Sequence, residues 1–259
     1  SQTGRQLLQN PLRLDNDRYT IDFEHLEQCA RQAKFLLLCS PHNPVGRVWQ
    51  RDELERLLAI AEKHQLIIFS DEIHADLIYP GNRHHALGAI SHGADIITAV
   101  APSKTFNIPG LNLSALIVPD KTIRNAIIQV FNSFHVSASN PFSITAFEAA
   151  YRGGEAWLDA LLHYLRDTRD AVESYLAEHL PEIKVIPAEG TYLLWLDCRD
   201  WRLSDAQLKH FFIHAAGIGL NPGVQFGHEG SGFMRLNIGM PRRTVFRILE
   251  KITEAKFYR

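Results

Sequence analysis

Short runs that are apolar at every position alternate with a helical pattern through the first half of the chain. The runs are Phe35–Cys39, Leu66–Phe69 and Ile96–Val100, and apolar residues recur at helical spacing from Leu54 to Ala61. Uniformly apolar runs are typical of parallel strands whose two faces are both covered. We therefore predict an α/β fold on a mostly parallel sheet, with the chemistry on the loops at the carboxyl ends of the strands.

The second half of the chain changes pattern after one long helix, which the apolar spacing predicts over Glu155–His179. Shorter elements follow it: strands at Lys184–Ile186 and Tyr192–Asp197, a helix from the Ser204–Gln207 capping box to Gly217, and a closing helix after Pro241. We predict that residues 1–145 are part of a large domain, that 146–180 are connecting helices, and that 181–259 form a smaller α+β C-terminal domain.

Composition narrows the classes of partner. Hydrophobic residues make up 46% of the 259 residues and charged residues 22%, which is enough apolar content for a packed core. The formal net charge is −2 with the two signs interspersed, so no basic stripe predicts a nucleic-acid partner. No apolar stretch reaches the roughly 18 to 20 residues that span a bilayer. We expect a small-molecule substrate, no nucleic acid and no membrane contact.

The three cysteines, Cys29, Cys39 and Cys198, are scattered along the chain. They form no CxxC pair and nothing that resembles metal-ligand spacing. An odd number of scattered thiols is typical of a reducing compartment. We therefore expect no metal site and a cytoplasmic location.

The first candidate site is the turn Ser40–Gly46, directly after the first apolar run. Two prolines and a glycine within this stretch impose a rigid turn. Asn43, between the prolines, presents an amide that can donate to a phenolate-type oxygen. The alternative is an ordinary strand-to-helix turn without chemistry.

The second candidate site is the stretch Ser70–His74 at the end of the second run. Asp71 there can hold a protonated pyridine nitrogen, which makes such a ring an electron sink, and His74 can hydrogen-bond a ring oxygen or shuttle a proton. Alternatively, Asp71 caps the next turn and His74 is a satisfied surface histidine. His84 and His85, on the loop beyond, are left out of the site because surface histidines mostly have no role.

The third candidate site is Ala101–Asn107, after the third run. Lys104 is read as a lysine on a loop that enters a cleft, where an imine-forming amine belongs because the amine must be desolvated and able to lose its proton. Ser103 beside it supplies a hydroxyl donor. The commoner alternative is an exposed lysine without a role.

The fourth candidate site is Arg235, within the strand-like stretch Gly230–Pro241. The planar guanidinium of an arginine can bind a carboxylate through two parallel hydrogen bonds. A structural ion pair is the alternative interpretation.

The four sites occur in the order Asn43, Asp71, Lys104 and Arg235, and in this order the chain resembles the fold type I enzymes of aminotransferase class I/II, which depend on pyridoxal phosphate (PLP). The resemblance implies that Asn43 contacts the ring oxygen of PLP, that Asp71 holds its pyridinium, that Lys104 binds it as a Schiff base, and that Arg235 binds the substrate α-carboxylate. It also implies cofactor contacts by His74 and Ser103.

Within this superfamily the chain looks most similar to the MalY/PatB group, the cystathionine β-lyase-type C–S lyases. The stretches that carry the likeness are Pro41–Pro44, Asp71–His74, Pro102–Leu111 and Arg235–Ile238. His74 stands where typical aminotransferases carry tyrosine. Asn112 stands where many of them place a phosphate-binding arginine. Both departures favour the lyase group.

The resemblance implies β-elimination from cystathionine or a cysteine S-conjugate, giving a thiol, pyruvate and ammonia, with Lys104 as the general base. The alternatives are an aminotransferase of the same fold, a regulatory PLP-fold module without catalysis, and an inactive fragment. The last alternative arises because 42 residues precede Asn43, whereas family members carry a longer N-terminal part, so that the chain looks N-terminally truncated.

The family resemblance also implies a homodimer, because fold type I sites are built at a dimer interface. Ser139 and Asn140, just before the helix expected near Ser143, are candidates to face the cofactor of a neighbouring subunit. A helix N-cap is the alternative reading of the same pair.

Overall fold

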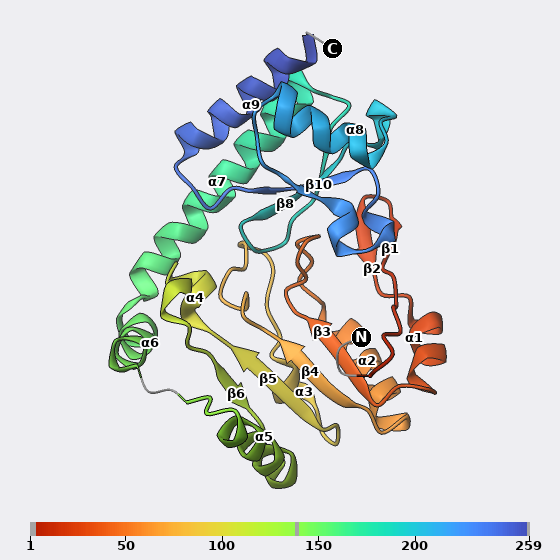
Figure 1. The fold of residues 1–259 in the computed structure, drawn as a ribbon, viewed down its shortest axis with the longest axis vertical. Helices are drawn as coiled ribbons and strands as arrows, with labels where there is room; N and C mark the ends of the chain where they lie inside the picture. Colours follow the sequence, from red (N-terminus) through yellow and green to blue (C-terminus); the bar gives the residue numbers. More distant parts are fainter. Residues whose placement is uncertain (1–3, 138–139, 258–259) are drawn as a thin grey trace. The chain divides into compact units, whose positions relative to one another are not determined.

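The computed structural model describes residues 4–137 and 140–257, and its chain divides into two compact units (Figure 1). The first unit holds the described residues of 1–15, 19–41 and 48–159. The second holds 16–18, 42–47 and 160–259, of which 258 and 259 are outside the described residues. The predicted domain boundaries at 145 and 180 stay a prediction.

The first unit is built on a four-stranded sheet in the order β3-β4-β5-β6. The strands are β3 (Phe35–Cys39), β4 (Ile67–Asp71), β5 (Ile96–Val100) and β6 (Ala115–Ile117). β3, β4 and β5 pair in parallel, and β6 is antiparallel to β5. The predicted mostly parallel sheet is therefore confirmed, and the three apolar runs are its parallel strands.

Six α-helices, the 3-10 helix Pro109–Leu111 and a two-stranded sheet, whose Arg18 falls in the second unit, are further elements of the described part of this half of the chain. The strands and α-helices are β1 (Arg13–Asp15), β2 (Arg18–Thr20), α1 (Phe23–Ala30), α2 (Arg51–Lys63), α3 (Leu87–Ile90), α4 (Pro102–Thr105), α5 (Lys121–Ser133) and α6 (Pro141–Gly153). α2 begins where the Glu53 carboxylate accepts the backbone N–H of Gln50 at 2.8 Å. The Asn140 side chain accepts the N–H of Phe142 at 3.0 Å and so caps α6, while Ser139 lies outside the described residues.

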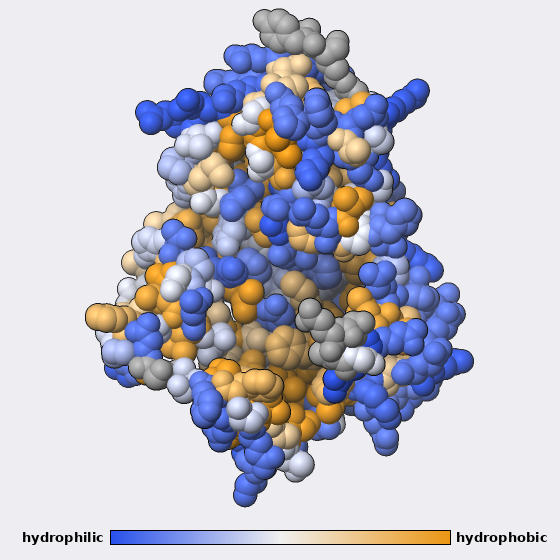
Figure 2. All heavy atoms as spheres, in the orientation of Figure 1, coloured by the Kyte–Doolittle hydropathy of each residue, from blue (hydrophilic) through white to orange (hydrophobic). Residues whose placement is uncertain are grey.

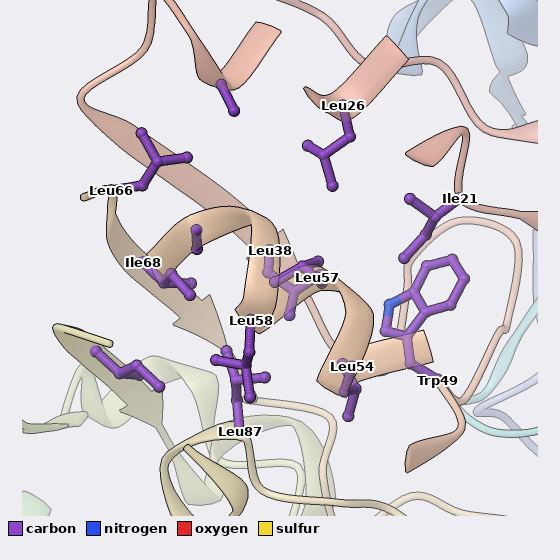
Figure 3. Packing of buried hydrophobic residues seen from close by; sticks show 13 residues of the cluster. Ile21, Leu26, Leu38, Trp49, Leu54, Leu57, Leu58, Leu66, Ile68 and Leu87 are labelled. Carbon is purple, nitrogen blue, oxygen red and sulfur yellow. The ribbon is translucent and has the colours of Figure 1, made fainter. Parts of the chain in front are cut away.

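The core of the first unit lies between α2 and one face of the sheet (Figure 3). Leu54, Leu57 and Leu58 of α2 are at most 4% exposed, and they share a cluster with Leu38 of β3 and Ile68 of β4. The leucines of α2 recur at helical spacing, and the buried residues of β3 and β4 alternate with more exposed ones. In both cases the spacing places the apolar side chains on the face that points into the core. This packing holds the strand ends in place.

The opposite face of the sheet is open at β3. Phe35 and Leu37 alternate with the buried Leu38 and are 53% and 68% exposed, and Figure 2 shows hydrophobic side chains at the surface over this part of the first unit. The expectation that these runs are covered on both faces is wrong for β3, because no described element packs on Phe35 and Leu37. Such a face normally needs a cover.

The second unit carries an antiparallel sheet in the order β7-β8-β10-β9. Its strands are β7 (Lys184–Ile186), β8 (Leu193–Asp197), β9 (Asn221–Pro222) and β10 (Phe233–Asn237). Every residue of β8 is buried. The stacked rings of Trp195 and Phe233, 5.3 Å apart, join β8 to β10. Arg235 thus lies in a strand, as the sequence predicts.

The predicted helices of the second half are confirmed. α7 spans Glu155–His179, α8 spans Asp205–His210, and α9 spans Arg242–Phe257. The Ser204 hydroxyl caps α8 through the N–H of Gln207. α8 continues as a π-helical turn, Phe211–Ala215, before Gly217 adopts a left-handed φ of 64°. α9 buries Val245, Leu249 and Ile252 completely.

Cys29, Cys39 and Cys198 are not joined in disulfide bonds. Burial raises the pKa of the Cys198 thiol, and the nearby Asp197 charge adds to the effect. Within residues 4–137 and 140–257, no helix has the length and apolar content that crossing a membrane requires.

Neighbouring leucines of β3 test the one-sided burial of the sheet. Leu38→Ala removes a side chain that is 7% exposed and opens a cavity in the cluster, so the free energy of unfolding is expected to fall by about 3 kcal/mol. Leu37→Ala changes a side chain that is 68% exposed, so the free energy of unfolding is expected to change by no more than about 0.5 kcal/mol. Urea unfolding followed by circular dichroism measures both, and equal losses would contradict the assignment of faces.

Candidate functional site

Two candidate residues of the first unit follow neighbouring parallel strands. Asp71 is the last residue of β4 and pairs with Cys39 and Ala99 on either side. Lys104 comes shortly after β5, in α4 (Figure 1). Because parallel strands end at the same edge of a sheet, both side chains belong to the carboxyl edge, where α/β proteins bind ligands.

Lys104 lies in a short helix, so its predicted position on a loop is wrong. Pro102 occupies the first turn of α4, where its fixed φ favours a helix, and its carbonyl accepts the N–H of Phe106 at 2.9 Å. The Lys104 side chain is partly buried. Among the described residues, none makes a hydrogen bond or an ion pair with its amine. The amine is therefore available to an incoming group.

Asp71 uses part of its carboxylate locally. Its Oδ1 accepts the N–H of Ile73 at 3.3 Å, which is the turn cap that the alternative interpretation predicts. Its backbone carbonyl accepts the N–H of Ser40 at 3.0 Å. Oδ2 accepts no hydrogen bond from the described residues, so the cap and a further role as an acceptor are compatible.

His74 and Ser103 lie in the same unit. His74 is only 4% exposed, so its alternative interpretation as a surface histidine is wrong. The Ser103 side chain is partly buried, and its carbonyl accepts the N–H of Ile108 at 3.2 Å. The roles predicted for His74 and Ser103 toward a cofactor stay predictions.

Sequence reasoning missed a buried carboxylate beside Asp71. Glu72 is 3% exposed and accepts from the Ser70 hydroxyl at 2.9 Å, the Leu87 N–H at 3.1 Å and the His84 ring at 2.8 Å. A buried carboxylate persists only when such partners offset its lost hydration. Glu72 therefore connects the turn that carries Asp71 to the loop beyond it by hydrogen bonds. One of these bonds comes from His84, which the sequence analysis left out of the site.

In the second unit, the turn that carries Asn43 docks on the segment 188–190. Gly46 has a φ of 72°, and a Cβ there would stand 2.9 Å from the Cβ of Ala188, so both conformation and space require glycine. The Gly46 carbonyl accepts the N–H groups of Glu189 and Gly190. These contacts fix the turn to its neighbour.

An ion pair completes this docking. The Arg47 side chain is 1% exposed, and its Nε donates to the Glu189 carboxylate at 2.9 Å. Arg18 donates to the other oxygen of the same carboxylate at 3.0 Å. One carboxylate thus serves two guanidinium groups and holds the turn of Asn43 in place.

Arg235 binds the amide oxygens of two asparagines. Its Nη1 donates to Asn43 Oδ1 and its Nη2 to Asn221 Oδ1, each at 2.9 Å. The guanidinium lies 4.8 Å from the centre of the Phe226 ring. Its Nε is buried without a hydrogen-bond partner among the described residues. The alternative interpretation of Arg235 as a structural ion pair is therefore wrong.

Among the described residues, these contacts give Arg235 no negatively charged partner. Burial lowers the pKa of Arg235, although Tyr192 opposes this effect. Because Asn43 and Asn221 are neutral, the charge is not compensated and can attract a carboxylate. Since Asn43 Oδ1 accepts from Arg235, its amide N–H groups point elsewhere and remain donors.

The structure thus groups the predicted residues by unit. Asp71, His74, Ser103 and Lys104 belong to the first unit, and Asn43 and Arg235 belong to the second. Asn221, Glu72 and His84 were not predicted. Within the described residues, no three His, Cys, Asp or Glu side chains are grouped so that they could hold a metal ion.

Comparisons with known proteins agree on one family. The sequence model of aminotransferase class I and II matches residues 6–252. Cystathionine beta-lyase PatB of Bacillus subtilis (strain 168) is 40% identical over 97% of this chain, and protein MalY of Escherichia coli (strain K12) is 34% identical over 92%. The crystal structure of cystalysin from Treponema denticola, which contains pyridoxal 5'-phosphate, matches 95% of this chain with a TM-score of 0.93 at 37% identity.

The chain spans 66% of the length of PatB, 62% of MalY and 64% of the cystalysin chain. The predicted fold, fold type I of the PLP enzymes, is confirmed by these likenesses, and so is the predicted resemblance to the cystathionine β-lyase group.

The docking of the Asn43 turn predicts that substitution of Glu189 and of Glu55 lowers the free energy of unfolding by unequal amounts. Glu189→Gln removes the carboxylate from the buried Arg47 guanidinium, so the free energy of unfolding is expected to fall by about 2 to 4 kcal/mol. Glu55→Gln breaks an exposed pair with Arg51 and is expected to cost no more than about 0.5 kcal/mol. Denaturant unfolding compares the two variants, and a neutral Glu189→Gln would contradict the docking role.

Proposed function

Because the chain belongs to the aminotransferase class I and II family, we propose that it serves in PLP-dependent β-elimination from cystathionine or a cysteine S-conjugate. The products are a thiol, pyruvate and ammonia. The proposal is carried by Lys104, a partly buried residue to whose amine no described residue makes a hydrogen bond or an ion pair. The likeness to PatB and cystalysin supports a C–S lyase within this family.

The chemistry of the available groups fits PLP. Lys104 offers an amine for the aldehyde, and Asp71 offers a carboxylate oxygen for the pyridine nitrogen. Asn43 offers amide N–H groups for the ring oxygen, since its own oxygen is held by Arg235. Ser103 offers a hydroxyl that would bind the phosphate, and His74 offers a ring nitrogen that would hydrogen-bond the ring oxygen. PLP, when bound, withdraws electrons from the substrate Cα and so makes its proton removable.

Lys104 is the proposed general base. With the cofactor and substrate bound, the Lys104 amine would take the proton from the substrate Cα. Loss of a thiolate from Cβ would complete the elimination, and water would hydrolyse the released enamine to pyruvate and ammonia. Asp71, at the carboxyl edge of β4, would hold the pyridinium nitrogen of the cofactor and so sustain its electron demand.

Arg235 is the proposed clamp for the substrate α-carboxylate. Its guanidinium is held by two amide oxygens and one aromatic ring, and all three contacts leave its charge uncompensated. A carboxylate fixed in this way sets which bond at Cα lies perpendicular to the cofactor ring, and therefore which bond breaks.

The same proposal extends to assembly and location. We propose a homodimer, supported by α5, which has no buried residue and exposes Ile128 and Phe131. Apolar side chains gathered on one helix normally mark a contact surface. We also propose a reducing, cytoplasmic location, supported by the three cysteines, none of which is joined in a disulfide bond. The proposed substrate is a small amino acid.

Lys104→Ala tests the reaction in the purified protein that carries this sequence. The wild type with PLP is expected to release pyruvate from cystathionine without a keto-acid acceptor, and the variant is expected to lose this release by at least about a thousandfold, because it lacks both the covalent anchor and the base. Lys121→Ala, at the start of α5, is the control and keeps activity. Transamination by the wild type without pyruvate release would make the lyase assignment wrong and favour an aminotransferase.

Asn221→Asp tests the uncompensated charge of Arg235. The new carboxylate keeps the shape of the side chain but neutralises the guanidinium, so KM for the amino-acid substrate is expected to rise about tenfold or more. Asn237→Asp adds the same charge at an exposed position of β10 and is expected to leave KM within about twofold. Equal effects of the two variants would mean that the net charge of the sheet, rather than Arg235, is responsible.

A further inference from the structure

A hydrogen bond joins the segment of Lys104 to the turn of Asp71. Thr105 directly follows Lys104 and is completely buried, and its Oγ1 donates to Asp76 Oδ2 at 2.9 Å. Asp76 ends the turn that begins after Asp71. The bond therefore connects the two carboxyl-edge segments that follow β4 and β5.

The Asp76 side of this bond is held firmly. Within its turn, the N–H of Ala75 donates to the Glu72 carbonyl at 2.9 Å, and the N–H of Leu77 donates to the His74 carbonyl at 3.0 Å. The buried Glu72 carboxylate anchors the start of the turn through its own three partners. Asp76 is thus a fixed acceptor for Thr105 rather than a side chain on a free loop.

The other neighbour of Lys104 is held by aromatic packing. The Phe106 ring lies 5.8 Å from the Tyr151 ring and 5.6 Å from the Trp157 ring. Gly154 packs so closely that a Cβ there would stand 2.3 Å from Phe106 Cε1. Lys104 is therefore flanked by two anchored residues.

The Asp76 carboxylate also acts on this aromatic cluster. Burial raises the pKa of Tyr151 to about 12, and the negative charge of Asp76 contributes to the rise. The Asp76 charge thus acts on Thr105 and on Tyr151, whose ring packs against Phe106. A hydroxyl that donates to a carboxylate makes a stronger hydrogen bond than one between neutral groups.

We propose that Asp76 and Thr105 are positioning residues that hold the Lys104 amine at the carboxyl edge for reaction with the PLP aldehyde. In this reaction the amine nitrogen adds to the aldehyde carbon, and the aldehyde oxygen leaves as water. The inference rests on the proposed function. Its physical basis is that a displacement of about 1 Å at a reacting group costs up to about a hundredfold in rate.

The test measures how fast PLP attaches to Lys104, by borohydride trapping and mass spectrometry of the Lys104 peptide in the full protein. Thr105→Val keeps the volume and removes the donor, and the trapping rate is expected to fall about tenfold or more. Thr105→Ser restores the hydroxyl and is expected to trap within about twofold of the wild type. Trapping by Thr105→Val at the wild-type rate would overturn the inference.

Thr168→Val is the matched control for a lost buried hydroxyl. Thr168 is also completely buried, and it donates to the Tyr164 carbonyl at 2.7 Å in the second unit. This variant is expected to trap PLP at the wild-type rate. If it slows trapping as much as Thr105→Val does, general destabilisation is the cause and the positioning role is wrong.

Pyridoxamine phosphate separates positioning from loss of the binding site, since it lacks the aldehyde and cannot bond to Lys104. Thr105→Val is expected to bind it within about twofold of the wild type by calorimetry. A matching loss of this affinity would contradict positioning. If the variant does not fold, Asp76→Asn, which keeps an acceptor oxygen but removes the charge, decides instead: slower trapping supports the inference and an unchanged rate overturns it.

Wild-type trapping also separates the inference from the proposed function. If the wild-type protein attaches no PLP at Lys104, the proposed function fails together with the inference. If the wild type attaches PLP and the Thr105 and Asp76 variants do so equally fast, only the positioning role fails.

Discussion

Parallel pairing of β3, β4 and β5 determines where the chemistry of the first unit lies. Asp71 pairs in register with Cys39 and Ala99, and Glu72 continues the pattern by donating its N–H to the Ala99 carbonyl. All segments that leave this edge start from fixed positions, because each strand end is bonded to its neighbour. The buried Glu72 and the Thr105–Asp76 bond then secure two of these segments over the edge. Without the strand register, neither Asp71 nor Lys104 has a defined place.

The sheet is covered unevenly, and this follows from the same pairing. One face packs on the leucines of α2, while Phe35 and Leu37 on the other face are exposed. A parallel sheet is normally buried on both faces because its side chains are apolar on both. The exposed face of β3 is thus a surface that calls for a protein cover.

The sequence patterns predicted the helices and strands better than they predicted the side-chain contacts. Uniformly apolar runs marked β3 and β5 with their observed bounds, and spacing marked α7, because both signals are local and repeated. The short helix of Lys104 was missed, since four residues carry no periodicity. The partners of Glu72 were also missed, and so was the bond between Arg235 and Asn43, which are 192 residues apart. Long-range side-chain pairs leave no trace in a single sequence.

The arginines of the second unit differ in what neutralises them. Arg47 is buried against Glu189, and Arg199 pairs with Asp197 at 2.6 Å, so a carboxylate of the same unit neutralises each of these charges. Within the part of the chain that the structure describes, Arg235 contacts the neutral oxygens of Asn43 and Asn221 and the face of Phe226 instead of a carboxylate. An aspartate in place of either asparagine would hold the guanidinium equally well. Its negative charge, however, would cancel the attraction of Arg235 for an anion. Neutral acceptors therefore combine a fixed orientation with a charge that remains available, which is what binding a substrate carboxylate requires.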